Sequence, residues 1–203
     1  MSITNKKPLR PVGVGAMYYC GITAIADDGT MTFKPDVVRL RTVSQIQTTE
    51  SRSVTPVYAS NSIYDEETNT APPLLAIQHV AFPAEILAEM RGNKVTGGFI
   101  MHSTFDQGAY FAIGIVYPKR DGKADYVWYP KCLLVDANHS AQTSNESGSN
   151  AQDRTLNIQT YEFETEDHLY QTEYDSELIG SGVTAITEEA YFAAPLLAPL
   201  PVT

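Results

Sequence analysis

The side chains that most often catalyse reactions or bind metals are few and scattered in this sequence. The four histidines stand at positions 79, 102, 139 and 168, and no pair has the HxxxH spacing of a metal site. His79 and His102 lie in apolar segments, so we expect them to be packed rather than ligating. Cys20 and Cys132 are far apart and form no CxxC pattern, which excludes a disulfide scaffold and a zinc–cysteine site. Two buried thiols in a reducing compartment are the favoured interpretation, with a single bridge as the alternative.

Motifs for cofactors and phosphates are also missing. Gly13 and Gly15 match two glycines of a dinucleotide pattern, but they precede a predicted strand and no helix follows. There is no P-loop, and the acidic turns at 27–28 and 65–67 lack the ligand spacing of a calcium loop. We therefore expect no enzyme, no catalytic residue, no cofactor and no metal site.

Composition narrows the class of protein. The chain has 203 residues, which suggests one domain, and 43% of them are hydrophobic, as in globular proteins. Its 24 acidic and 14 basic side chains give a formal charge of −10, which argues against binding to the phosphate backbone of nucleic acids. No stretch approaches the roughly 20 apolar residues that span a membrane, and residues 1–14 lack the apolar core of a signal peptide. We expect synthesis as a soluble cytosolic chain without membrane contact.

Most segments have the composition and alternation of β-strands. The predicted strands cover 18–26 and 31–33 as a hairpin, 37–48, 54–64 with an irregular middle, 74–82, 99–105, 110–117 and 124–135 around an Asp-Gly turn, and 156–166. One helix is predicted over residues 83–92, with Pro83 at its start, Ile86, Leu87 and Met90 on one face, and Gly92 as C-cap. The polar stretch 141–153 is expected to be a loop.

The two ends differ from the middle. We divide the chain into an N-terminal arm (1–15), a β-domain (16–177) and an extended proline-rich C-terminal arm (178–203). The candidate inter-subunit residues of the arms are Lys6, Lys7, Arg10, Tyr191, Phe192, Leu196 and Leu197. Prolines at 195, 199 and 201 exclude a helix or central strand there. The apolar side chains of this tail must lie either on their own subunit or on a neighbour, and we expect residues 1–12 and 190–203 to be ordered only by neighbouring subunits.

Charge is unevenly distributed. Residues 1–52 contain seven basic and four acidic side chains, whereas residues 140–203 contain one basic and eleven acidic side chains. Such polarity favours head-to-tail contacts between copies, which produce rings or filaments. The alternative is that the two parts neutralise each other within one fold. Glu162, Glu164 and Glu166 would form an acidic row on one strand face, either a solvated surface or a wall that repels nucleic acid.

Five stretches together resemble the major tail proteins of long-tailed bacteriophages, the subunits of the tail tube. They are residues 13–19 (GVGAMYY), 57–64 (VYASNSIY), 82–92 (FPAEILAEMRG), 114–123 (GIVYPKRDGK) with 126–131 (YVWYPK), and 160–164 (TYEFE). Residues 178–203 have no counterpart in this resemblance.

The resemblance implies an antiparallel β-sandwich or barrel with one short flanking helix. It also implies hexameric rings stacked into a hollow virion tail tube, with tape measure, tail tip and tail terminator proteins as partners. DNA would pass through the lumen without specific binding, past an acidic wall at Glu162, Glu164 and Glu166. Residues 45–70, rich in Thr and Ser, are a further candidate for ring-to-ring contact. The alternative function is a β-sandwich adhesion or receptor-binding module of a phage tail.

Overall fold

The computed structural model describes residues 8–139, 153–163, 168–179 and 184–198. Within these ranges the chain is mainly β and antiparallel, as predicted, with a sheet that is not closed into a barrel. In chain order the elements are β1 (Met17–Ile25), β2 (Met31–Phe33), β3 (Val38–Leu40), β4 (Val43–Ala59), β5 (Ser62–His79), α1 (Ala84–Arg91), β6 (Lys94–Thr96), β7 (Phe99–Met101), β8 (Phe111–Pro118), the 3-10 turn η1 (Arg120–Gly122), β9 (Ala124–His139), β10 (Arg154–Thr160), β11 (Thr172–Asp175) and α2 (Glu188–Tyr191).

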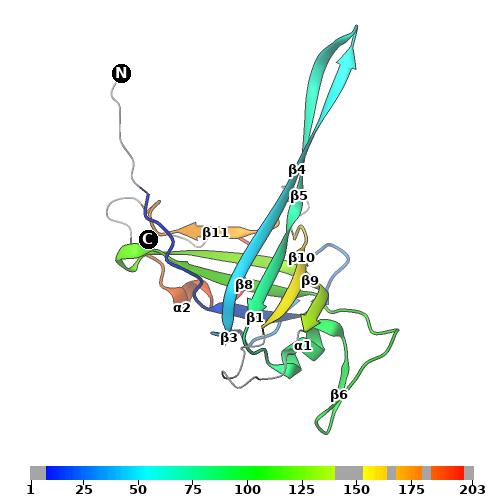
Figure 1. Ribbon diagram of the computed structural model, residues 1–203, viewed down its shortest axis with the longest axis vertical. Coiled ribbons are helices and arrows are strands. Elements are labelled where there is room, and N and C mark those ends of the chain that lie inside the picture. The colour runs from blue at the N-terminus through cyan, green and yellow to red at the C-terminus, as the bar shows by residue number, and fades with distance from the viewer. Residues whose placement is uncertain (1–7, 140–152, 164–167, 180–183, 199–203) are drawn as a thin grey trace, which may run out of the picture.

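One antiparallel sheet dominates the molecule, with the strand order β2-β1-β8-β9-β10-β5-β4 (Figure 1). β3 pairs with the first half of β1, and β11 pairs with the first half of β9. β6 and β7 form a separate two-stranded hairpin. The long strand β9 pairs with β8 and β11 in its first half and with β10 in its second half, so it joins the two halves of the sheet.

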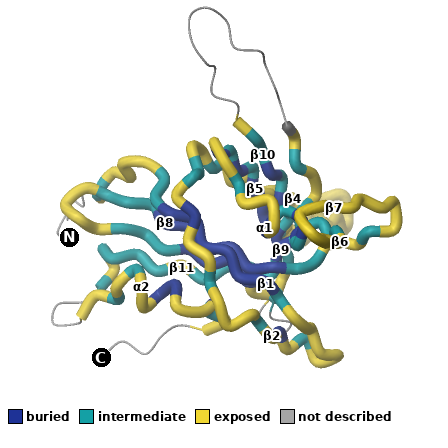
Figure 2. Tube along the Cα trace, turned by 90° about the horizontal axis from the view of Figure 1, so that it is seen from below, coloured by how far each residue is buried: buried dark blue, intermediate teal, exposed yellow. Residues whose placement is uncertain are grey.

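The middle of the sheet is buried on both faces. Side chains alternate between the two faces of a strand, so Met17 and Tyr19 of β1 join one apolar cluster while Tyr18 and Cys20 join the other. The first cluster includes Ile86 and Met90 from α1 and side chains from β5 and β10. The second contains the C-terminal segment around α2. Figure 2 shows the buried stretches running along β1 and β8. This two-sided core is consistent with a β-sandwich.

The predicted helix is confirmed, because its end signals are local. Pro83 is the N-cap residue, and Gly92 takes the left-handed C-cap conformation with φ of 71°. A Cβ at position 92 would lie 2.0 Å from the carbonyl oxygen of Gln107, so only glycine fits there. The Lys34–Glu89 ion pair, 2.8 Å between Nζ and Oε1, joins α1 to the segment after β2. The short helix α2 was not predicted.

Several predicted strand boundaries are wrong. Residues 54–64 are not one strand, because the chain reverses at Ser60 and Asn61, whose φ values of 51° and 63° suit a two-residue hairpin turn. Residues 37–48 divide into β3 and the start of β4, and the strand predicted over 99–105 ends at Met101. The strand predicted to reach residue 166 ends at Thr160. Among the described residues no helix is long and apolar enough to cross a bilayer.

Candidate assembly surfaces

The most prominent surface is a hairpin formed by the outer halves of β4 and β5, which projects far from the body (Figure 1). The two strands stay paired from Val43–His79 to Ala59–Ser62. Every residue from 47 to 71 is exposed. The nine residues from Ser51 to Ala59 alone span roughly 30 Å as extended strand. We call residues 51–71 the projecting hairpin.

The root of this hairpin is firmly anchored. Leu75, Ile77 and His79 of β5 are fully buried, and this part of β5 pairs with β10 as well as β4. Beyond the root, each strand pairs only with the other among the residues that the structure describes. A two-stranded ribbon is marginally stable alone in water, so the projecting hairpin is a surface that a partner would stabilise.

The end of the projecting hairpin combines apolar and acidic side chains. Val57, Tyr58, Ile63 and Tyr64 are exposed, with Tyr64 at 78%. Next to them on β5 stand the carboxylates of residues 65–67, which face the uncharged residues 55–57 of β4 across the pair. The residues directly opposite this acidic stretch therefore provide no cation to neutralise it.

A second apolar surface lies on the β6–β7 hairpin and the loop after it. Val95, Phe99, Ile100 and Met101 are exposed, and Phe105 reaches 90%. The loop is held by Asp106, whose Oδ2 accepts hydrogen bonds from Asn93 Nδ2 at 2.8 Å and from the Ser103 N–H at 2.6 Å. We call residues 94–105 the β6–β7 patch. Sequence reasoning did not identify it, and His102, expected to be packed, is exposed there.

The described part of the N-terminal arm is bound to its own subunit. Val12 N–H donates to the Pro118 carbonyl at 2.8 Å, and Leu9 N–H donates to the Glu177 carboxylate at 3.1 Å. The expectation that residues 1–12 depend on neighbouring subunits is therefore wrong for residues 8–12. Arg10 is exposed, whereas Lys6 and Lys7 lie outside the described residues.

Beneath this arm, the largely buried Lys119 contacts three carboxylates. Its Nζ lies 2.6 Å from Asp125, 2.9 Å from Asp175 and 3.3 Å from Glu177. Burial opposes the charge on Lys119, but these hydrogen bonds outweigh it and raise the pKa of the ammonium. Burial also raises the pKa of Asp125, with Asp175 adding to the effect. For Asp175, hydrogen bonds from the Glu177 N–H and Lys119 overcome burial and lower the pKa. These ion pairs connect the β8–β9 turn to β11 and the segment after it.

Two aromatic residues of the proline-rich C-terminal arm belong to the hydrophobic core of the subunit. Tyr191 and Phe192 are 3% and 2% exposed. The Phe192 ring stacks on Tyr18 with centroids 4.1 Å apart, and the indole N–H of Trp128 donates to the Tyr191 carbonyl at 3.2 Å. A Cβ at Gly114 would lie 2.5 Å from the Phe192 ring, so the absence of a side chain there makes room for it. Because both side chains are buried within their own subunit, the prediction that Tyr191 and Phe192 contact a neighbouring subunit is wrong.

The remaining C-terminal candidates lie nearer the surface. Leu196 is partly buried against the same cluster, and its carbonyl accepts a 2.6 Å hydrogen bond from Thr172 Oγ1. Leu197 is 39% exposed. The boundary predicted at residue 178 therefore does not separate an independent arm, because residues 186–196 complete the core.

Part of the uneven charge is neutralised within the subunit. Arg39, from the basic first part, pairs with Glu188 of α2, and Glu188 also accepts a 2.6 Å hydrogen bond from the Tyr18 hydroxyl. These two contacts of the Glu188 carboxylate hold the start of α2 against β1 and β3. At this ion pair the basic and acidic parts of the chain therefore neutralise each other within one subunit, as the alternative interpretation predicted.

The predicted acidic row is not on one strand. Glu162 lies beyond the end of β10, is exposed, and contacts His168 Nδ1 at 2.8 Å. Glu164 and Glu166 lie outside the described residues. At the end of the strand, Thr160 Oγ1 donates to the Pro73 carbonyl at 2.7 Å, and the Tyr161 N–H donates to the Lys131 carbonyl at 2.8 Å. A role in a lumen wall stays a prediction.

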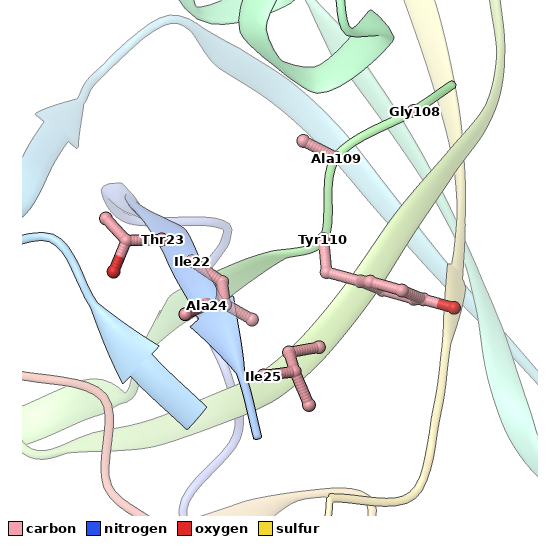
Figure 3. Close-up of a pocket in the computed structure, with 7 residues that line it drawn as sticks. All are labelled: Ile22, Thr23, Ala24, Ile25, Gly108, Ala109 and Tyr110. Atoms are coloured by element: carbon pink, nitrogen blue, oxygen red, sulfur yellow. The ribbon is translucent and has the colours of Figure 1, made fainter. Parts of the chain in front are cut away.

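Reactive groups are scattered or buried. Cys20 and Cys132 are free and buried, and burial raises the pKa of both thiols, to about 11 for Cys20. Within the described ranges no group of three or more His, Cys, Asp or Glu side chains could hold a metal. A cavity of about 360 Å³ beside the end of β1 is lined by residues 22–25 and 108–110 (Figure 3). These side chains include no carboxylate, imidazole or thiol, so this cavity offers no acid–base pair.

The comparisons with known proteins point to one family. A family model described as "Phage tail tube protein" matches residues 24–193. A chain from a structure titled "Cryo-EM structure of the anti-feeding prophage (AFP) baseplate, 6-fold symmetrised" is similar in fold, with a TM-score of 0.50 and 8% sequence identity. That likeness covers 85% of this chain and 100% of the other. No match was found among curated proteins. Because the family model covers most of the sequence, the chain belongs to the phage tail tube protein family.

Proposed function

We propose that this protein is the subunit of a phage tail tube, and that six copies close into a ring whose stacked copies form a hollow tube for DNA. The coarser part is established: the chain is a structural protein of the phage tail, from a family that is structural rather than catalytic. The ring of six, the stacking and the passage of DNA are the proposal.

The observation that carries the proposal is the projecting hairpin. Residues 47–71 are exposed on both strands, yet they keep regular pairing to the tip. Such a ribbon has too little apolar burial of its own for stability, so its pairing makes physical sense if other subunits cover it. We propose that it makes the contact between rings.

The sheet edges support closure into a ring. The strand order leaves β4 at one edge and β2 with β3 at the other. Uncovered strand edges invite pairing with other chains, and a closed ring satisfies them with copies of the same chain.

Net charge supports passage of DNA without binding. Six copies at −10 would give a ring a formal charge of −60. A bore lined by carboxylates repels phosphates, so the genome would not adhere to the wall. We propose Glu162, Glu164 and Glu166 for this wall, and tape measure, tail tip and tail terminator proteins as partners at the lumen and ends of the tube.

Shortening the hairpin tests the proposal. Arg52 and Thr70 are paired, so residues 53–69 can be replaced by an Asn-Gly turn without breaking the remaining register. We expect this variant to be a folded monomer with unchanged Trp128 fluorescence that forms no tubes by negative-stain microscopy, while the wild type does.

Two outcomes contradict it. Normal tubes from the shortened variant would show that the hairpin has no part in stacking. A wild-type protein that stays monomeric or trimeric by light scattering at high concentration would instead favour an adhesion or receptor-binding module.

A further inference from the structure

The two largest groups of exposed apolar side chains lie at opposite ends of the molecule. With the longest axis vertical, the tip of the projecting hairpin is at the top of Figure 1 and the β6–β7 patch is at the bottom. In Figure 2, β6 and β7 lie on the same side of the molecule as β4. A second copy displaced along the long axis would therefore bring its hairpin tip toward this patch.

We propose that the β6–β7 patch is the acceptor for the projecting hairpin of another copy of this chain. This inference rests on the proposed function, and it names the surface that each hairpin contacts. The contact is heterologous, since two different surfaces meet, and each copy presents one of each. Repetition of such a contact along an axis produces an open linear polymer.

The two surfaces expose apolar side chains of similar kinds. The tip offers Val57, Tyr58, Ile63 and Tyr64, with exposures of 38%, 67%, 54% and 78%. The patch offers Val95, Phe99, Ile100, Met101 and Phe105, with exposures of 48%, 75%, 36%, 48% and 90%. Aromatic and methionine side chains of this kind are enriched in protein interfaces. Tyr58 pairs with Ile63 on the hairpin and Val95 pairs with Ile100 on the patch, so each surface has two adjacent exposed apolar side chains on one face. Neighbouring exposed apolar side chains mark candidate sites of protein interaction.

Charge favours the same pairing. The tip carries the carboxylates of Asp65, Glu66 and Glu67, while the patch carries the ammonium of exposed Lys94. Asp106, just after the patch, is directed into its own loop by hydrogen bonds from Asn93 Nδ2 and the Ser103 N–H. Opposite charge at the edge of an apolar contact fixes its register and orientation.

Backbone geometry makes the patch a suitable platform. Gly97 and Gly98 form the β6–β7 turn with φ values of 57° and 84°, which gives a tight end to the hairpin. The N-terminal end of this hairpin follows directly on α1, whose C-cap Gly92 donates its N–H to the Glu89 carbonyl at 2.9 Å. The patch is thus held to the core through α1 and the Asp106 contacts.

Cross-linking between two variants, each with one introduced cysteine, tests the inference directly. Ser62→Cys places a thiol at the hairpin tip, and Thr96→Cys places one beside the β6–β7 turn. The native thiols are buried, so the introduced ones are the accessible pair. A disulfide requires Cα atoms within about 7 Å, so only adjacent sites react. We expect covalent dimers when the two variants are mixed, assembled and oxidised, and none from either variant alone.

The matched control is Ala26→Cys, an exposed site at the β1–β2 turn. Tubes without Ser62–Thr96 cross-links, or equal cross-linking of Ser62→Cys with Ala26→Cys, would overturn the acceptor assignment while the proposed function stands. Failure of the wild type to form tubes would overturn both.

Side-chain substitutions provide a second test. Phe99→Ser removes an exposed side chain, so the monomer should stay folded, but the concentration needed for polymerisation should rise about tenfold or more. Val135→Ser, at an apolar residue that is 60% exposed outside the patch, is the control and should leave it unchanged. Lys94→Glu should also weaken polymerisation, and the added Glu66→Lys should restore it. Equal effects of Phe99→Ser and Val135→Ser, or no restoration by the charge exchange, would contradict the pairing.

Discussion

At the residue scale, His79 illustrates how burial sets the chemistry of a side chain. It is fully buried at the end of β5, with its ring 4.8 Å from the Phe82 ring. Burial, and then the positive charge of Arg154, lower the pKa of His79 below its ordinary value. The neutral imidazole is therefore a packing residue at the root of the projecting hairpin, as its apolar surroundings in the sequence predicted.

This lowered pKa predicts a loss of stability in mild acid. Above the ordinary histidine pKa both folded and unfolded chains hold a neutral imidazole, so stability is complete. As the pH falls below that value, the unfolded chain takes up the proton first, and stability declines until the pH passes the lower folded pKa. Urea unfolding at pH 7.5 and pH 5.0 should give a smaller pH effect for His79→Gln than for wild type. The exposed His102→Gln is the control, and equal pH effects in all three proteins would contradict the assignment.

At the element scale, the C-terminal segment completes a core that the strands alone leave open. Tyr191 and Phe192 cover the face of the sheet formed by Tyr18, Gly114 and Trp128. Thr187 caps α2 by accepting a 3.2 Å hydrogen bond from the Ala190 N–H, which holds both rings at the end of one short helix.

Removing the Phe192 ring should therefore destabilise the folded monomer. Phe192→Ala should lower the free energy of unfolding by about 3–5 kcal/mol, because it leaves a cavity in a packed core. Leu197→Ala, at a residue that is 39% exposed, should cost less than about 1 kcal/mol. Chemical unfolding followed by the fluorescence of Trp128, the single tryptophan, measures both. Similar stabilities of the two variants would mean that Phe192 does not anchor this segment.

The sequence predicted elements well where their signals are local. The helix α1 was found from Pro83 and Gly92, and the β8–β9 hairpin from its Asp-Gly turn, because these residues act on their own backbone. The β4–β5 turn was missed because Ser60 and Asn61 lack the glycine that usually marks such turns. The burial of Phe192 depends on Gly114, 78 positions earlier, and the exposure of Phe99 depends on packing of the whole chain. No local pattern carries that information.

At the scale of the whole molecule, we propose that the uneven charge acts in the assembly of subunits. Within one subunit, Arg39 with Glu188 and Lys119 with its carboxylates neutralise part of the charge. The formal net charge of the chain is −10, and we propose that much of it faces solvent or the bore of the tube.

Reversing charge in the proposed bore should slow DNA release without preventing tube assembly. Virions carrying Glu162→Lys, Glu164→Lys and Glu166→Lys should eject DNA more slowly, since each ring of six would exchange 18 carboxylates for 18 ammonium groups that attract phosphates. Asp27→Lys, Asp28→Lys and Asp36→Lys make the same change in charge at exposed positions of the first part. Equal ejection rates in time-resolved DNA release from both sets would remove these glutamates from the wall.

We propose that this chain becomes functional by binding copies of itself along and around one axis. Cryo-electron microscopy of the purified protein at high concentration tests this most directly. We predict hollow tubes of stacked six-membered rings, with the projecting hairpin of each subunit seated on the β6–β7 patch of a subunit in the adjacent ring. Isolated particles with the hairpin extended into solvent at every concentration would contradict the claim.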